Sequence, residues 1–284
     1  MMNGKFTMTF EQYLADPCPR PSLTRSTIKD LITKTPRHAF WNHPKLNPDF
    51  QPEESATHFD IGTAAHTIFL EGTDDVAVSL PYDDWRKKEA QAARDEARAN
   101  GKVPLLAKQY DSVMAMVEVA NKSLSESELG LKVEWGEPEL TYIWKEQPDD
   151  LYCRIRPDWI NTERTIILDY KTSGRSAEPE DFSRVITQNG LDIQDALYRR
   201  GVSEIEGTTP DFIFMVQEVE PPYPCSFIEL DLQFQEMGKE KVKRGLHLWR
   251  ECMKSGVWPS YSNRIYTVEP PSYSLAQWEL RKAG

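Results

Sequence analysis

Two neighbouring stretches, residues 152–158 and 165–171, constrain the fold more than any other part of the sequence. Both contain the β-branched, aromatic and aliphatic residues that favour strands, and the polar segment 161–164 between them is typical of a turn. A third strand candidate, residues 139–144, comes directly before this pair. The sequence therefore predicts a three-stranded meander, in which successive strands are neighbours in one sheet.

The end of the second stretch carries charges that are unusual for a strand. Side chains alternate between the two faces of a strand, so Asp169 and Lys171 share one face and Tyr170 lies on the other. We expect Asp158, at the end of the first stretch, to lie beside them. The residues before Asp169 are apolar, and charges placed at the end of such a run are costly if they are buried without partners. The sequence therefore predicts two carboxylates and a lysine at one sheet edge.

A divalent metal ion would give these charges a partner. Carboxylates supply the hard oxygen ligands that Mg²⁺ prefers, and bound Mg²⁺ keeps several waters and contacts substrate phosphate. Lys171 could hold a water or the charge that develops at phosphorus. This is the chemistry of metal-assisted phosphodiester hydrolysis. The simpler alternative is an ordinary salt bridge at a strand end, because the pattern Asp-x-Lys is common.

A predicted helix upstream carries a histidine that could join this site. Residues 61–72 have small side chains early and Gly72 as a plausible C-cap. Gly62 allows another backbone to approach closely. A lone histidine such as His66 is more often a hydrogen-bonded core residue than a ligand, but its imidazole could reach a metal if this helix packs against Asp158.

A second predicted helix, residues 191–200, follows the strand pair and ends at Gly201. Gln194 and Tyr198 lie one turn apart on it and so share a face. Further along the chain, residues 211–217 and 226–230 are predicted strands, and residues 235–253 form a predicted helix with many basic residues. That helix is the best candidate for contacting DNA phosphates, and a plain solvated helix is equally consistent with its acidic residues.

Composition bounds the class of protein. Hydrophobic residues make up 39% and charged residues 28% of the chain, which indicates a soluble globular protein. No apolar run is long enough to cross a bilayer, and the N-terminus has no signal pattern, so a cytoplasmic location is expected. The four scattered cysteines argue against zinc and iron–sulfur sites. The net charge of −11 argues against a generally basic DNA-coating surface, but not against a local DNA groove beside an acidic metal site.

These elements, in this order, resemble the PD-(D/E)xK nuclease core as it occurs in RecB-like nucleases. Pro157-Asp158, Asp169-Tyr170-Lys171 and the helix with Gln194 and Tyr198 match its motifs. Together with the sequence Gly-Thr-Ala-Ala-His at residues 62–66, they look like the nuclease domain of the phage exonuclease VIII (RecE) group. The resemblance covers residues 22–258. It implies an α/β (α+β) fold with a restriction-endonuclease-like core, in which helices flank a central mixed β-sheet.

The resemblance also implies a function. Members of that group are magnesium-dependent 5′-to-3′ exonucleases that act on the ends of double-stranded DNA and leave a 3′ single strand for an annealing protein. It therefore implies Mg²⁺, with Mn²⁺ as a substitute, and a RecT-like annealing partner in phage-type homologous recombination. It further implies a homo-oligomeric ring in the cytoplasm of a bacterial host cell, with no membrane contact.

Site residues follow from the same resemblance. It implies that His66, Asp158 and Asp169 bind metal, that Lys171 positions or activates the attacking water, and that Gln194 and Tyr198 orient the substrate near the metal. Related nucleases commonly add a glutamate to the metal site. Here that residue is Glu139 or Glu71, and the sequence does not settle which.

The expected organisation has three parts. Residues 1–55 form an N-terminal helical or irregular extension that packs on the core, residues 56–258 form the nuclease domain, and residues 259–284 form a C-terminal tail that wraps the body. Two other functions stay open: an endonuclease, because the same metal site cuts internal bonds in an open cleft, and a non-catalytic DNA-binding module of the same fold. The complete set of two aspartates and a lysine argues against the non-catalytic alternative.

Overall fold

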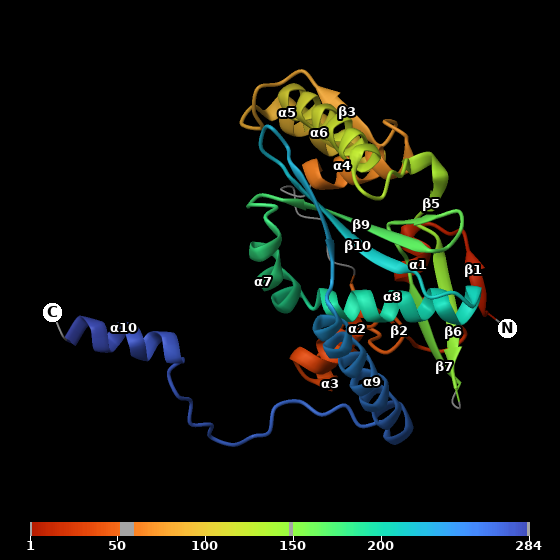
Figure 1. Cartoon of the computed structure of the whole chain (residues 1–284), viewed down its shortest axis with the longest axis vertical. Coiled ribbons are helices and arrows are strands. Elements are labelled where there is room, and N and C mark those ends of the chain that lie inside the picture. The colour runs from red at the N-terminus through yellow and green to blue at the C-terminus, as the bar shows by residue number, and fades with distance from the viewer. Residues whose placement is uncertain (1, 52–59, 148–149, 283–284) are drawn as a thin grey trace.

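The computed structural model describes residues 2–51, 60–147 and 150–282, and it places β-sheets at the centre of the molecule with helices on both sides (Figure 1). The largest sheet has five strands in the order β11-β10-β9-β8-β5. Strands β9 and β10 run parallel at its centre, and the other neighbouring strands are antiparallel. The strands are β5 (Gly136–Pro138), β8 (Trp159–Asn161), β9 (Ile166–Ser173), β10 (Asp211–Glu218) and β11 (Cys225–Glu229).

A second sheet has four strands in the order β1-β6-β7-β2, and its strand β7 leads to Asp158. Because β7 and β9 lie in different sheets, the predicted three-stranded meander is wrong. Pro157 has no backbone N–H for a strand ladder, and the chain leaves β7 there and enters the short strand β8, which pairs with β9. The strands are β1 (Gly4–Phe6), β2 (Ser22–Leu23), β6 (Thr141–Glu146) and β7 (Leu151–Ile155), and a separate parallel pair consists of β3 (Ala77–Leu80) and β4 (Val103–Leu106).

Strands β9 and β10 are buried on both faces, as the centre of a parallel pair should be. Ile167 and Phe214 belong to one hydrophobic cluster, whereas Leu168 and Tyr170 belong to another on the opposite face. This alternation is the one that the sequence predicts for residues 165–171.

Helices cover the two faces. On one side lie α4 and α6, joined by α5, and on the other side α8 packs against β6, β7 and α9, with α2 and α3 beside α9 (Figure 1). Helices on both sides of a mixed central sheet confirm the predicted fold class. The helices are α1 (Phe10–Leu14), α2 (Arg25–Thr33), α3 (Pro36–Trp41), α4 (Asp60–Glu71), α5 (Lys88–Ala99), α6 (Ala107–Glu126), α7 (Pro179–Asn189), α8 (Leu191–Glu206), α9 (Leu232–Ser255) and α10 (Ser272–Lys282).

Helix α8 does not end at Gly201, as expected from the sequence, but continues to Glu206. Gly201 is a packing residue instead: a Cβ atom at this position would lie 2.5 Å from the ring of Trp144 on β6. The glycine therefore lets helix and sheet approach closely, and Gly207, with a φ of 74°, caps the helix.

The two ends of the chain behave differently. Residues near the N-terminus share the main hydrophobic core, in which Leu23, Ile28 and Leu31 are buried. The expected boundary at residues 55 and 56 lies outside the described residues. Pro259 and Tyr261 contact helix α3, but beyond Ser262 the side chains are almost all exposed and α10 stands apart from the body (Figure 1), so the tail lies against the body only at its start. Within the described part of the chain, no helix combines the length and the apolarity needed to cross a bilayer.

Candidate metal centre

Asp158 lies in the turn between β7 and β8 and is fixed against two other segments. Its Oδ2 atom accepts a hydrogen bond of 3.0 Å from the backbone N–H of Tyr170 on β9. Its carbonyl oxygen accepts one of 3.1 Å from the backbone N–H of Glu139. These bonds set the Asp158 carboxylate beside the middle of β9, just past the residues of β9 that pair with β8, although no strand ladder joins β7 to β9. The predicted position at a sheet edge is therefore wrong, because β9 is an internal strand with β10 on its other side.

The second carboxylate, Asp169, lies on β9 and is fully buried, with 0% of its surface exposed. Its Oδ2 atom contacts the ammonium group of Lys171, and its Oδ1 atom accepts a hydrogen bond from the side-chain amide of Gln194 on α8. Tyr170 points to the opposite face, where its ring lies 5.0 Å from that of Phe69. The structure thus brings the two aspartates and the lysine together in the way that strand alternation requires.

His66 reaches the same place from α4. Its Nε2 atom lies 3.2 Å from Oδ2 of Asp158 and 3.9 Å from Oε1 of Glu139. One ligand atom from each of these three residues lies within 4.8 Å of the other two. Ligands on opposite sides of an octahedral Mg²⁺ ion are about 4.2 Å apart, because each bond to oxygen is about 2.1 Å long. These three residues therefore fit a divalent cation. We refer to His66, Glu139, Asp158, Asp169 and Lys171 as the metal cluster.

Glu139 is held in place by an arginine. The Nε atom of Arg156 pairs with Oε2 of Glu139, which leaves Oε1 facing His66. Arg156 also donates a hydrogen bond of 2.7 Å to the carbonyl oxygen of Met8. Glu139 has a φ of 55°, a left-handed conformation that is uncommon for a residue with a long side chain and is often found at functional sites. Glu71 lines the same cavity outside the three-residue group, so the geometry favours Glu139 over Glu71.

A glycine on α4 sets the distance between His66 and the sheet. A Cβ atom at Gly62 would lie 2.7 Å from Oγ1 of Thr172 on β9. The close neighbour of Gly62 is therefore a side chain of β9, and not another backbone as the sequence predicts. Because His66 follows one turn later on the same helix, this contact also places the imidazole against Asp158.

The pKa values of the metal cluster are shifted by its closely spaced carboxylates. Burial, together with the neighbouring Asp158 carboxylate, raises the pKa of Asp169 to about 6. Burial and Asp158 likewise raise the pKa of Glu139. Burial alone would lower the pKa of His66, but Asp158 and Glu139 outweigh it and raise that pKa to about 9. Burial also opposes the charge of Lys171, yet Asp169 and Asp158 raise its pKa. The site therefore attracts positive charge strongly, as a cation-binding site should.

The metal cluster opens into a cavity of about 770 Å³ that His66, Glu139, Asp158 and Lys171 line together with Tyr198. A smaller cavity of about 340 Å³ is lined by Lys171, Gln194 and Tyr198 among others. Gln194 and Tyr198 thus share a helix face that points to the site, as the sequence predicts. Their role in orienting substrate stays a prediction.

Several residues at the site are not predicted from the sequence. Arg156 is one of them, although its position two residues before Asp158 is a signal that suggests a partner for a nearby acid. Phe10 and Arg25 line the cavities from segments more than 100 residues away in sequence, and no local pattern signals their presence.

The basic helix α9 is not part of this site. Three of its lysines are paired with acids, and none of its residues lines either of the two cavities described above. These pairs are Lys239 with Glu236 at 2.7 Å, Lys241 with Asp192 at 2.5 Å and Lys243 with Glu240 at 3.6 Å. The structure therefore favours the solvated, structural interpretation of this helix over a role in contacting DNA phosphates.

Known proteins share this architecture. The fold is similar to a crystal structure of a candidate exonuclease from Eubacterium rectale, with a TM-score of 0.60 and 16% identity over 95% of this chain and 98% of that chain. A second solved structure, of the protein SSO0001, has a TM-score of 0.29 and 12% identity over 74% of this chain and 99% of that chain, which is too little similarity to support an argument. No curated protein has a matching sequence. A family model described as a PDDEXK-like domain of unknown function (DUF3799) matches residues 25–270, and the chain therefore belongs to this family of PD-(D/E)xK nuclease-like domains.

Proposed function

We propose that this protein is a metal-dependent DNA exonuclease that degrades double-stranded ends in the 5′-to-3′ direction. The observation that carries the proposal is the convergence of His66, Glu139 and Asp158 on one point, beside the Asp169–Lys171 pair, in an open cavity. This arrangement joins a cation site to a lysine ammonium group, and both can stabilise the negative charge that develops when a phosphodiester is hydrolysed.

The protein groups divide the chemistry among them. A bound divalent cation supplies charge stabilisation at the phosphate and lowers the pKa of an attacking water. Lys171, whose raised pKa keeps it charged, holds a water or the negative charge that develops on the phosphate oxygens. Gln194 fixes the Asp169 carboxylate through its side-chain amide, and Arg156 fixes Glu139. Both supporting residues reduce the motion of the acids around the cation.

The finer features of the proposal rest on resemblance. The exonuclease VIII-like motifs support Mg²⁺, with Mn²⁺ as a substitute, and cutting from 5′ ends. They also support production of 3′ single strands for a RecT-like annealing protein in phage-type recombination. A homo-oligomeric ring in the bacterial cytoplasm would place a local DNA path within a body whose net charge is −11.

The test is digestion of linear duplex DNA labelled at its 5′ or its 3′ end, with a covalently closed circle alongside, in Mg²⁺ or Mn²⁺. Early release of the 5′ label with an intact circle is the expected result. Cutting of the circle would identify an endonuclease, because an exonuclease needs an end. An absence of cutting with either ion would favour a non-catalytic DNA-binding module. Asp158→Asn serves as the control, because it removes a predicted cation ligand.

A further inference from the structure

The two cavities of the site meet beneath helix α1. The larger cavity contains the metal cluster, and the smaller one is lined by residues of α1, α2 and α8. Phe10, Tyr13, Lys171 and Tyr198 line both. These four side chains therefore lie between the two cavities, and we call them the border residues. A strand that is cut at the metal cluster and extends into the smaller cavity has to pass them.

Helix α1, which carries two of the border residues, has a capped and anchored N-terminal end. Thr9 and Gln12 form a capping box, in which the Thr9 hydroxyl accepts from the backbone N–H of Gln12 at 3.2 Å and the Gln12 side chain accepts from the N–H of Thr9 at 3.0 Å. At the N-terminal side, Arg156 donates to the Met8 carbonyl oxygen. A short helix with such attachments can hold a side chain at a fixed position.

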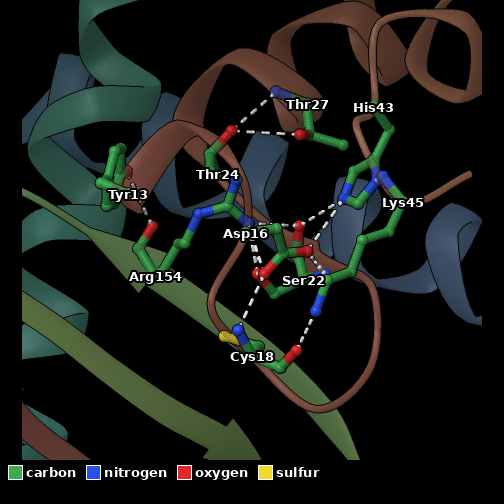
Figure 2. A network of polar contacts seen from close by, with 9 residues as sticks. All are labelled: Tyr13, Asp16, Cys18, Ser22, Thr24, Thr27, His43, Lys45 and Arg154. Atoms are coloured by element: carbon green, nitrogen blue, oxygen red, sulfur yellow. Dashed lines mark hydrogen bonds and ion pairs between the residues drawn. The ribbon is translucent and has the colours of Figure 1, made fainter. Parts of the chain in front are cut away.

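Tyr13 attaches the other end of the helix. Its hydroxyl lies 3.5 Å from the carbonyl oxygen of Arg154, and the Arg154 guanidinium lies 5.2 Å from the centre of its ring (Figure 2). Arg154 is itself held by the buried carboxylate of Asp16, at 3.2 Å. Helix α1 is therefore connected to the strand that leads to Asp158, and its position is coupled to that of the metal cluster.

Phe10 is the one aromatic border residue whose ring is largely exposed to solvent. It is 55% exposed, whereas Tyr13 and Tyr198 are buried. An exposed ring makes little contribution to the core. The flat apolar face of the Phe10 ring lies between two cavities that are also lined by lysine and arginine side chains. Such a face is suited to stacking against another flat apolar ring.

We propose that Phe10 stacks on an unpaired nucleobase of the strand that enters the metal cluster. This inference rests on the proposed function and specifies its substrate: a DNA end whose terminal bases are separated, or a single strand. Bases stack on aromatic side chains with little dependence on sequence, while cations hold the backbone. Lys171 and Arg25 line the smaller cavity and Lys171 and Arg156 the larger one, so each cavity has cationic side chains in its wall.

The first experiment measures stacking directly. The Asp169→Asn variant of the 284-residue chain is mixed, in Ca²⁺, with a single-stranded oligonucleotide that carries 2-aminopurine near its 5′ end, and the fluorescence is recorded. We expect quenching, because 2-aminopurine loses fluorescence when it stacks. Adding Phe10→Ala should remove the quenching and weaken binding about tenfold. Trp41→Ala is the matched control, because Trp41 is also 55% exposed but lines neither cavity. Equal quenching with and without Phe10 would overturn the proposal.

The second experiment separates this inference from the proposed function. Bis(p-nitrophenyl) phosphate is a phosphodiester without nucleobases, so its hydrolysis reports the metal cluster alone. We expect the ratio of the rate on frayed DNA to the rate on this ester to fall about tenfold in Phe10→Ala and to stay at the wild-type value in Trp41→Ala. Hydrolysis of both substrates with an unchanged ratio in Phe10→Ala would overturn the stacking role alone. An absence of hydrolysis of either substrate by the wild-type protein would overturn the nuclease proposal itself.

Two further variants distinguish stacking from packing. Phe10→Leu keeps an apolar side chain on α1 but removes the aromatic face. Its ratio of the rate on frayed DNA to the rate on the ester should therefore fall as far as in Phe10→Ala, and this result does not depend on how well the alanine variant folds. Phe10→Tyr keeps the face and should restore the wild-type ratio. A wild-type ratio in Phe10→Leu would contradict stacking.

Discussion

Two polar clusters in this protein have similar residues and opposite properties. The first, which we call the support cluster, consists of Asp16, Ser22, His43 and Arg154 (Figure 2). Its Asp16 carboxylate accepts hydrogen bonds of 2.8 Å from both the backbone N–H and the hydroxyl of Ser22, and it lies 3.4 Å from His43. The second is the metal cluster. Each contains carboxylate, imidazole and a cationic side chain, but the metal cluster faces the larger cavity, whereas His43 and Arg154 of the support cluster line the smaller one.

The difference lies in exposure and in the balance of charge. In the support cluster no more than 4% of the Asp16, His43 and Arg154 side chains is exposed, whereas His66 and Lys171 of the metal cluster are 25% and 33% exposed. One carboxylate meets one guanidinium in the support cluster, and burial, the largest effect, lowers the pKa of His43 to about 4 and keeps it neutral. The metal cluster holds its histidine charged instead. A buried cluster with balanced charges stabilises the fold, and an acidic, accessible one is ready for a cation.

The largest expected effect is on catalysis. Asp169→Asn should reduce DNA hydrolysis by about 10³-fold or more, because it removes a carboxylate from the charge distribution around the cation and the phosphate. The melting temperature should stay close to that of the wild type, because the change also removes repulsion between Asp169 and Asp158. Rates on labelled duplex DNA and thermal unfolding check both parts. Wild-type activity in this variant would refute the assignment of the site.

The same substitution in the support cluster should have the reverse effect. Asp16→Asn leaves the buried Arg154 charge without its carboxylate, which should cost about 3–5 kcal/mol in the free energy of unfolding. The fraction that folds should still hydrolyse DNA. Urea unfolding provides the measurement. The control is Asp150→Asn, because Asp150 is 58% exposed and its ion pairs with Arg20 and Lys145 lie at the surface; its cost should be within about 1 kcal/mol. Equal costs for the two variants would show that the support cluster is not structural.

The sequence predicts much of the metal cluster because its signal is local. Alternation along one strand is enough to place Asp169 and Lys171 on one face and Tyr170 on the other. Helical spacing is enough to place Gln194 with Tyr198. A choice between Glu139 and Glu71 needed the structure, because it depends on how two distant segments meet.

The parts that were wrong or missing depend on long-range pairing. The pattern of residues 152–171 looks like one hairpin, but the chain changes sheets at Pro157, and nothing in an alternating pattern records which strand lies alongside. The support cluster could not be found at all, since Asp16 and Arg154 are far apart in sequence. Gly201 has the pattern of a helix end, and only the ring of Trp144 against it explains why the helix continues.

The stability of the fold should depend on pH through His43 and Asp169. The unfolded chain protonates His43 near pH 6.5, whereas the folded protein resists protonation to about pH 4. As pH falls through this window the unfolded state binds more protons, so stability should fall by about 2–3 kcal/mol. Asp169 works in the other direction, because its raised pKa lets the folded state bind a proton first below about pH 6.

A comparison of variants separates these two effects. Urea unfolding between pH 7 and 4 should show a smaller loss of stability on acidification in His43→Gln than in the wild type, because glutamine has no proton to gain. In Asp169→Asn the loss should be larger than in the wild type, since the opposing group is gone. Identical pH profiles for the wild type and His43→Gln would contradict a neutral, buried His43.

The smallest expected effect is stabilisation by the cation itself. At a free concentration ten times the dissociation constant, an ion that binds only the folded state adds about 1.4 kcal/mol to the free energy of unfolding. Mg²⁺ and Ca²⁺ should both raise the melting temperature of the wild type, and Ca²⁺ should support DNA binding with little cleavage because its looser coordination activates water less well. The rise should vanish in Asp158→Asn, which removes the carboxylate shared by His66 and Tyr170, and persist in His43→Gln, where only the support cluster changes. A rise of equal size in Asp158→Asn would place the ion outside the metal cluster, and equal cleavage rates in the two ions would contradict its catalytic role.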